Sequence, residues 1–157
     1  MELLTEAILT PNERLTVERW LRDAADRLGL RDWAITVEQD HPNEGDHAAA
    51  MWTDYGSRRM RVWCRADLPT LSLDMQRQTL VHELMHVHLE DLDWYLEKTL
   101  PELLGKPAWS AVKQAVQLHS EHAVEAIACA VAQFFPMIEW PEVPPAESTL
   151  TQQEGTA

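Results

Sequence analysis

One run of thirty residues, Leu71–Leu100, constrains the fold more than any other part of the chain, because it contains no proline or glycine. Its central apolar residues are distributed nearly all round a helix, which indicates that the helix is buried. Those residues are Leu80, Val81, Leu84, Met85, Val87 and Leu89. Pro69 and the polar residues that follow it are typical start signals. We therefore predict a buried helix from about Ser72 to near Glu90.

The predicted helix carries the sequence His82-Glu83-Leu84-Met85-His86. A spacing of four residues places the two imidazoles on one helix face, one turn apart. Two neutral imidazoles in this arrangement suit two corners of a zinc tetrahedron, and the intervening Glu83 is suited to take a proton from water held at an open position. The alternative is a core helix whose histidines are only hydrogen-bonded.

A catalytic zinc site of this kind needs a third protein ligand. We expect it on the next long helix, predicted from Pro107 to about Phe135. Four side chains of that helix are candidates: His119, Glu121, His122 and Glu125. Glu121 and Glu125 are one turn apart, so one is suited to bind the metal while the other accepts a hydrogen bond from a ligand imidazole.

The segments before the buried helix predict an α+β domain. A helix is expected from Pro11 to Leu28, with Thr10 as its cap and Gly29 at its end. Three short strands are expected at Trp33–Glu38, Ala48–Thr53 and Arg58–Arg65. Short connections favour a small, mainly antiparallel three-stranded sheet packed on the buried helix. An edge strand of such a sheet is suited to bind an extended peptide.

The domain is expected to cover residues 1–140, followed by a tail at 141–157 that is rich in Pro, Glu and Gln and is predicted to be disordered. His41 and His47 flank a predicted loop and are interpreted as surface histidines. The segment Asp91–Lys106, which includes Trp94 and Leu96, is expected to form a wall of the cleft or merely to pack.

Charge and composition exclude some partners. The formal net charge is −13, and residues 78–157 hold three lysines against twelve acids. Nucleic acid is therefore not expected as a partner, because phosphate binding needs a basic surface. No apolar run reaches membrane length, so no membrane association is expected and the predicted location is cytoplasmic. Two cysteines are too few for a disulfide framework, and we expect both to be reduced and buried.

The motif residues, together with Glu125-Ala126, Ala130 and Phe134-Phe135-Pro136, resemble the ImmA/IrrE family of zinc metallopeptidases. The resemblance covers roughly residues 33–136. It implies a minimal zincin fold, with Glu125 as the third zinc ligand and a transcriptional repressor as the usual kind of substrate. SprT-like proteases are the second resemblance, since they also place short strands before this motif, and they imply His119 or His122 as the ligand.

The sequence thus predicts a zinc-dependent, gluzincin-like metallopeptidase that hydrolyses peptide bonds of a protein substrate with Glu83 as general base. Four side chains are candidates to stabilise the oxyanion: Tyr95, Tyr55, His119 and His122. The alternative function is a non-catalytic regulatory or assembly module in which zinc braces two helices. Binding by Glu121 and Glu125 together, with no position left for water, favours that alternative.

Overall fold

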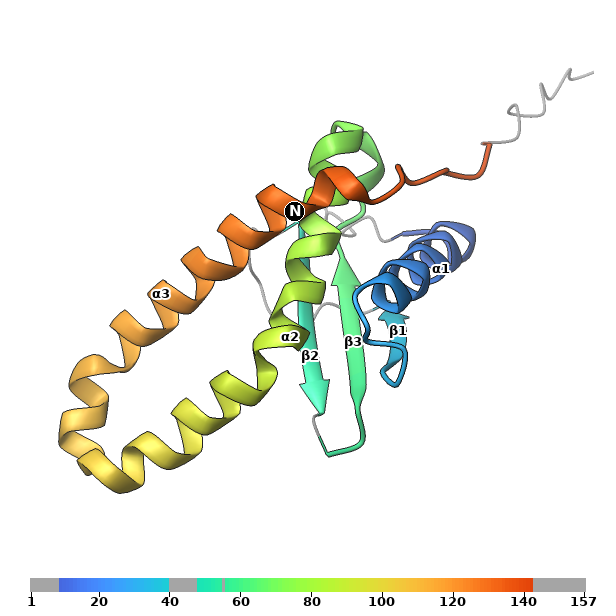
Figure 1. Ribbon diagram of the computed structural model, residues 1–157. Helices are drawn as coiled ribbons and strands as arrows, with labels where there is room; N and C mark the ends of the chain where they lie inside the picture. Colours follow the sequence, from blue (N-terminus) through green and yellow to red (C-terminus); the bar gives the residue numbers. More distant parts are fainter. Residues whose placement is uncertain (1–8, 40–47, 55, 143–157) are drawn as a thin grey trace, which may run out of the picture.

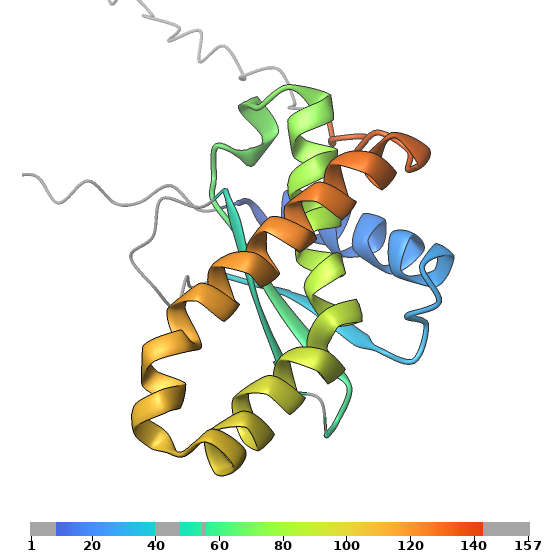
Figure 2. The same cartoon turned by 60° about the vertical axis from the view of Figure 1, so that its left-hand side comes forward.

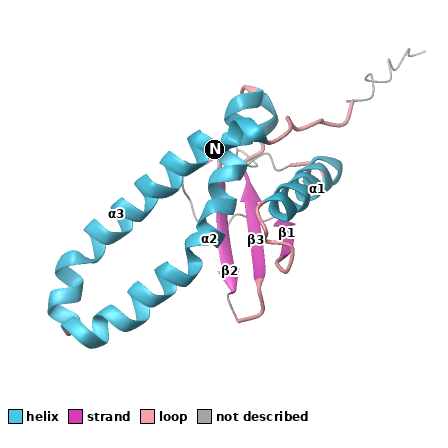
Figure 3. Ribbon diagram, viewed as in Figure 1, coloured by secondary structure: helices cyan, strands magenta, loops and turns pink. Residues whose placement is uncertain are grey.

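The computed structural model describes residues 9–39, 48–54 and 56–142. Predictions for His41, His47, Tyr55 and the tail from residue 143 onward lie outside the described residues. Over the described part, the chain is an α+β structure of three α-helices and one three-stranded mixed sheet (Figures 1 and 3). Its order is α1 (Pro11–Arg27), β1 (Ala34–Glu38), β2 (Ala49–Asp54), β3 (Arg59–Cys64), α2 (Leu73–Leu104) and α3 (Lys106–Val131). Short 3₁₀ turns follow β3 at Leu68–Thr70 and α3 at Ala132–Phe134.

Helix α1 has the predicted ends. The Thr10 side chain accepts a hydrogen bond from the Glu13 amide, and the Glu13 carboxylate accepts one from the Thr10 amide, which completes a capping box. Gly29 follows the helix with a φ of 76°, a conformation that costs glycine little. The buried face of α1 includes Val17, Trp20 and Leu21, whereas Leu15 is 59% exposed.

The sheet is mixed, so the prediction of a mainly antiparallel sheet is wrong. Strand β2 pairs antiparallel with β3, whereas β1 pairs parallel with β3, and the strand order is β1-β3-β2. A tight turn joins β2 to β3 and forces their antiparallel pairing. The two outer strands are only about 10 Å apart across β3, a distance that the longer connection between β1 and β2 is able to span. β3 takes the centre because Met60, Val62 and Trp63 are all buried.

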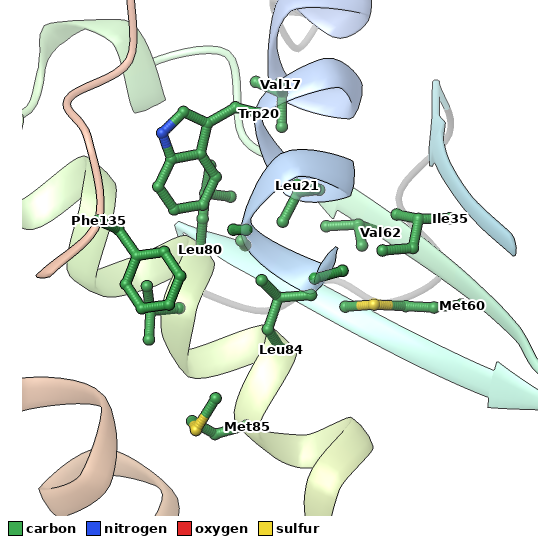
Figure 4. Packing of buried hydrophobic residues seen from close by; sticks show 14 of the residues in the cluster. Val17, Trp20, Leu21, Ile35, Met60, Val62, Leu80, Leu84, Met85 and Phe135 are labelled. Carbon is green, nitrogen blue, oxygen red and sulfur yellow. The ribbon is translucent and has the colours of Figure 1, made fainter. Parts of the chain in front are cut away.

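One face of the sheet holds the core. Side chains from α1, the sheet and the first half of α2 meet there, and Figure 4 shows Val17, Leu21, Ile35, Met60, Val62, Leu80 and Leu84 packed together. On the opposite face Thr36, Arg59 and Arg61 are exposed, Trp63 is buried, and the Arg61 guanidinium lies over the Trp52 ring at 4.3 Å. This gives two layers, with α1 and α2 on one side of the sheet.

Helix α2 begins where the sequence predicts but extends fourteen residues further, so the predicted end near Glu90 is wrong. The Ser72 side chain accepts a hydrogen bond from the Met75 amide as its cap. The apolar pattern fades after Leu89, but α2 continues through Pro101 to Leu104, and Gly105, with a φ of 80°, turns the chain into α3. The end of α2 and the start of α3 form an antiparallel pair that projects beyond the sheet (Figures 1 and 2). We call this part, residues 91–120, the helical arm.

The segment that follows α3 makes hydrogen bonds to α1 and α2. Trp20 donates an indole hydrogen bond to the Pro136 carbonyl (2.9 Å), and Arg77 donates one to the Phe135 carbonyl (3.0 Å). Gln76, only 1% exposed, accepts a hydrogen bond from the Trp140 indole and donates to the carbonyls of Pro69 and Leu71. The C-terminal half of α3 is thereby held beside α2.

None of the helices in the described ranges combines the length and apolar composition that crossing a bilayer requires.

Candidate metal centre

The two motif histidines lie side by side on α2. Leu80 and Leu84 bury the neighbouring face of the helix against the sheet, which turns His82 and His86 toward α3. Their ring centroids are 4.9 Å apart, and their Nε2 atoms are 3.2 Å apart. Both rings are partly buried. The spacing on one helix face is as the sequence predicts.

Glu121 of α3 supplies a third potential ligand. Its Oε2 atom lies 3.6 Å from Nε2 of His82 and 3.6 Å from Nε2 of His86. Ligand atoms at about 2.0–2.1 Å from a tetrahedral zinc ion are about 3.3 Å from one another. The three atoms therefore have nearly the mutual spacing that such an ion imposes. Among the described residues, this is the one group of three or more His, Cys, Asp or Glu side chains that is close enough to hold a metal.

Glu125, which the family resemblance implies as the ligand, takes a different place. Its Oε2 atom lies 3.0 Å from Nδ1 of His82, the ring nitrogen that points away from the three clustered atoms. Because a carboxylate is an acceptor, this contact places the proton on Nδ1 and leaves the lone pair of Nε2 free. The geometry thus favours Glu121 as third ligand and Glu125 as the hydrogen-bond acceptor, one of the two assignments that the sequence leaves open.

Two further side chains hold Glu125. Its Oε1 atom accepts hydrogen bonds from Nε2 of Gln78 at 2.8 Å and from Sγ of Cys129 at 3.3 Å. The Cys129 contact, followed by those from His82 and Gln78, keeps the pKa of Glu125 below its usual value. Cys129 is exposed, so the prediction that both cysteines are buried is wrong for this one. A carboxylate that stays ionised is a constant acceptor for the His82 ring.

Glu83 is the most deeply buried carboxylate of the site. Its side chain is 7% exposed, and it has no hydrogen-bond partner within the described ranges. Burial, with a smaller contribution from the Glu121 charge, raises the pKa of Glu83 to about 8. Burial beside Glu83 also raises the pKa of the Cys64 thiol, which therefore stays protonated. A carboxyl group with a raised pKa next to a second carboxylate is suited to exchange protons near neutral pH.

The imidazole of His86 favours its neutral form. Burial lowers the pKa of His86, the charge of Glu121 opposes that effect, and the nearby His82 lowers it further. Two Nε2 atoms at 3.2 Å leave room for at most one proton between them, because two facing N–H groups repel each other. Neutral imidazole is the form that binds metal ions.

Two hollows meet at the site. The larger, about 670 Å³, extends from His82, Glu83 and His86 toward the helical arm, with Ala49–Met51 of β2 along one side. The smaller, about 300 Å³, lies on the other side of His82 and Glu83 and is bordered by Ala48, Met75, Gln78 and Thr79. Together they flank the candidate metal centre along the edge of β2.

The other predicted site residues are not brought to the centre. Tyr95 is 50% exposed and does not border either hollow, and His119 and His122 are exposed and pair with each other at 6.2 Å between ring centroids. Tyr55 lies outside the described residues. His88 is exposed, as expected for a histidine that is not a ligand. Of the predicted wall residues, Trp94 and Leu96 border the larger hollow.

The sequence analysis does not predict three residues that lie at the site: Gln78, Glu90 and Asp93. All belong to the α2 stripe that contains the histidines, at one turn before His82 and at one and two turns after His86. Extending the helical period in both directions from the motif would have identified them. Cys129, four residues after Glu125, follows the same rule on α3.

Comparison with protein-family models, with curated proteins and with solved structures gives no match for this chain. The assignment of function therefore depends on the geometry and chemistry of the site.

Proposed function

We propose that this protein is a zinc-dependent peptidase with a minimal zincin fold. The observation that carries the proposal is the cluster of three ligand atoms, from His82, His86 and Glu121, at mutual distances of 3.2–3.6 Å. A helix that presents two imidazoles is common, but a carboxylate from another helix that completes the triangle is a specific arrangement. The buried Glu83 directly beside it gives the cluster a hydrolytic character.

The donor set fits zinc. Two imidazole nitrogens and one carboxylate oxygen are the protein ligands of the gluzincin type of catalytic site, and they leave a fourth position open. Zinc, when bound there, supplies the Lewis acidity that polarises a substrate carbonyl and acidifies a water molecule. A divalent cation also offsets the repulsion between the Glu83 and Glu121 carboxylates.

The residues of the chain supply the proton transfers. Glu83 accepts a proton from the attacking water and donates it to the departing amine, a role that its place between the two motif histidines supports. Glu125 fixes the orientation and tautomer of His82 through the Nδ1 contact. Burial of Glu83 keeps bulk water from competing for its proton.

The edge of β2 supports a peptide as substrate. In the described part of the chain β2 pairs with β3 alone, so its outer edge is free, and Ala49–Met51 border the cleft next to the histidines. A peptide that adds to this edge satisfies its backbone groups and passes the candidate metal centre with one part in each hollow. The resemblance to the ImmA/IrrE family suggests a repressor as substrate and a cytoplasmic location, and both stay predictions.

The non-catalytic module requires both Glu121 and Glu125 on the metal, with no position left for water. The placement of Glu125 on Nδ1 of His82, away from the three clustered atoms, supports the peptidase instead.

The test is zinc analysis combined with proteolysis assays on a peptide library and on repressor proteins. We expect one zinc per chain in the wild type, retained zinc with a loss of about 10²–10⁴ in cleavage rate for Glu83→Gln, and loss of zinc for His82→Ala. His88→Ala, which removes an exposed imidazole from the same helix, is the matched control and should retain both properties. A zinc-loaded wild type that cleaves no member of the library or repressor set would favour the module.

A further inference from the structure

The wall of the larger hollow is strongly acidic beyond the candidate metal centre. Glu90 and Asp93 of α2 border it directly after His86, and Glu97 borders it one turn further along. Lys98 is the one lysine or arginine on the described wall. The volume of about 670 Å³ is enough for a side chain and its neighbouring backbone.

These carboxylates differ in whether a nearby cation already balances their negative charge. Glu97 lies 3.7 Å from Nζ of Lys113, so a cation accompanies it. Asp93 accepts a hydrogen bond from the Ser120 hydroxyl at 3.1 Å, which orients it but leaves its charge in place. Within the described ranges neither Glu90 nor Asp93 forms an ion pair with a lysine or arginine, although both are partly buried. Partly buried negative charge without a counter-ion favours a cationic ligand.

The same hollow has an apolar side. Trp94, Leu96 and Val116 border it, together with the buried Trp109. A lysine or arginine side chain is complementary to such a surface, because its methylene stem packs on apolar groups while its charged end reaches carboxylates. The indole rings offer further attraction to a cation.

The smaller hollow has a different chemistry. It is bordered by Ala48, Met75, Gln78 and Thr79, and its outer carboxylate, Glu125, already accepts hydrogen bonds from Gln78 and Cys129. The two sides of the centre thus differ in the number of carboxylates outside the centre. Glu90, Asp93 and Glu97 border the larger hollow, whereas among the described residues Glu125 alone borders the smaller one, and both of its oxygens already accept hydrogen bonds within the protein. The unpartnered and buried Glu83 borders both hollows, which indicates that a polar ligand passes between them.

We propose that the larger hollow is a specificity pocket, in which Glu90 and Asp93 select a lysine or arginine side chain of the substrate on one side of the cleaved bond. The proposal rests on the proposed peptidase function, which it deepens by naming the class of substrate. It predicts no preference for a cation on the other side, where the smaller hollow lies.

The first test measures cleavage by the zinc-loaded full chain. Quenched fluorescent peptides are compared that differ at a single position, with Lys, norleucine or Glu on either side of the cleaved bond. We expect kcat/KM to be about tenfold higher for Lys than for Glu on one side only. The double variant Glu90→Gln/Asp93→Asn should lose this preference. Asp91→Asn removes a neighbouring exposed charge outside the hollow and should keep it.

The second test does not need turnover. Binding of the Lys and Glu peptides to zinc-loaded Glu83→Gln protein is followed by fluorescence anisotropy, with and without the Glu90→Gln/Asp93→Asn changes. We expect about fivefold tighter binding of the Lys peptide, reduced by added salt and abolished by the two changes. Equal binding of the two peptides, or a preference that survives the double change, overturns the pocket. A preserved preference without cleavage of any peptide overturns the peptidase function alone.

Discussion

Glu83 combines a proton-transfer position with nearly complete burial, and the second property affects stability. In the metal-free folded protein its pKa is raised to about 8, against an ordinary value of 4.5 in the unfolded chain. Between these two pH values the folded state holds the extra proton. The contribution of Glu83 to stability is therefore fully present below about pH 4.5 and is lost as the pH rises through about 8.

We predict that Glu83→Gln removes this pH-dependent loss of stability in the metal-free protein. The variant and the wild type should be similarly stable at pH 5, and the variant should be more stable at pH 9 by as much as about 4 kcal/mol. Urea unfolding of chelator-treated protein across this range measures the difference. Glu102→Gln, at an exposed position of the arm, is the control and should parallel the wild type. Parallel curves for Glu83→Gln as well would mean that Glu83 ionises freely.

Glu121 and Glu125 should differ in their effect on zinc affinity. Glu121→Gln removes an anionic donor from the cluster itself, whereas Glu125→Gln changes only the partner of Nδ1 of His82. We predict that Glu125→Gln weakens zinc binding by about 10–100-fold and that Glu121→Gln weakens it more. Competition with a chromophoric chelator gives both affinities. The reverse order would make Glu125 the ligand, as the family resemblance implies.

The choice between these two glutamates shows where sequence reasoning stopped. The motif spacing alone predicts that His82 and His86 share a face, because both belong to one rigid helix. Glu121 and Glu125 also share a face, but which one meets the histidines depends on how α3 is rotated and shifted against α2. That register depends on contacts far from the motif. They include the hydrogen bonds that Phe135, Pro136 and Trp140 make with α1 and α2.

At the scale of elements, α3 is positioned by small and branched residues on the face that carries the glutamates. Val124 and Ala128 are fully buried one turn apart, directly beside Glu121 and Glu125. The small side chain of Ala128 allows α3 to approach α2 closely. The distance from Glu121 to the histidines therefore depends on the volume at position 128.

We predict that Ala128→Leu lowers the free energy of unfolding by about 1–3 kcal/mol, because the added volume overpacks the interface. Zinc affinity should fall with it, since the change pushes Glu121 away from the imidazoles. Denaturant unfolding and chelator competition measure the two effects. Ala130→Leu, an exposed position on the same helix, is the matched control and should change neither. Wild-type zinc affinity in Ala128→Leu would show that the site tolerates a shift of α3.

The sequence predicts which segments are helices and which are strands. It predicts the pairing of the strands and the length of α2 less well. Caps such as Thr10 and Ser72 act locally, so the starts of α1 and α2 follow from sequence. The place of β3 between β1 and β2 depends on burial along the whole strand, which a period of two does not reveal where Met60, Val62 and Trp63 are all buried. The length of α2 was missed because the end of an apolar pattern was taken as the end of a helix.

At the scale of the whole molecule, the candidate metal centre links α2 to α3. The hydrophobic core links these helices only along part of their length. The core contains Leu80, Leu84 and Val87 of α2 and Val124 and Ala128 of α3, but no residue of the helical arm. Within the arm, the hydrogen bond of Ser120 to Asp93 links the two helices at the base, and the ion pair of Lys113 with Glu97 links them further out. A metal ion that bridges His82, His86 and Glu121 would add a link between α2 and α3 at the boundary between core and arm.

We therefore predict that zinc stabilises the entire fold. Binding to the folded state alone at a free concentration of about 1,000 times Kd adds about 4 kcal/mol, which raises Tm by about 8–16 °C in a chain of this length. Thermal unfolding with and without a chelator measures the shift, with His88→Ala as the control that should respond like the wild type. His82→Ala should show almost no shift, because it removes one of the three clustered atoms. A shift in His82→Ala as large as that of the wild type would place the stabilising ion elsewhere and separate the metal from α2 and α3.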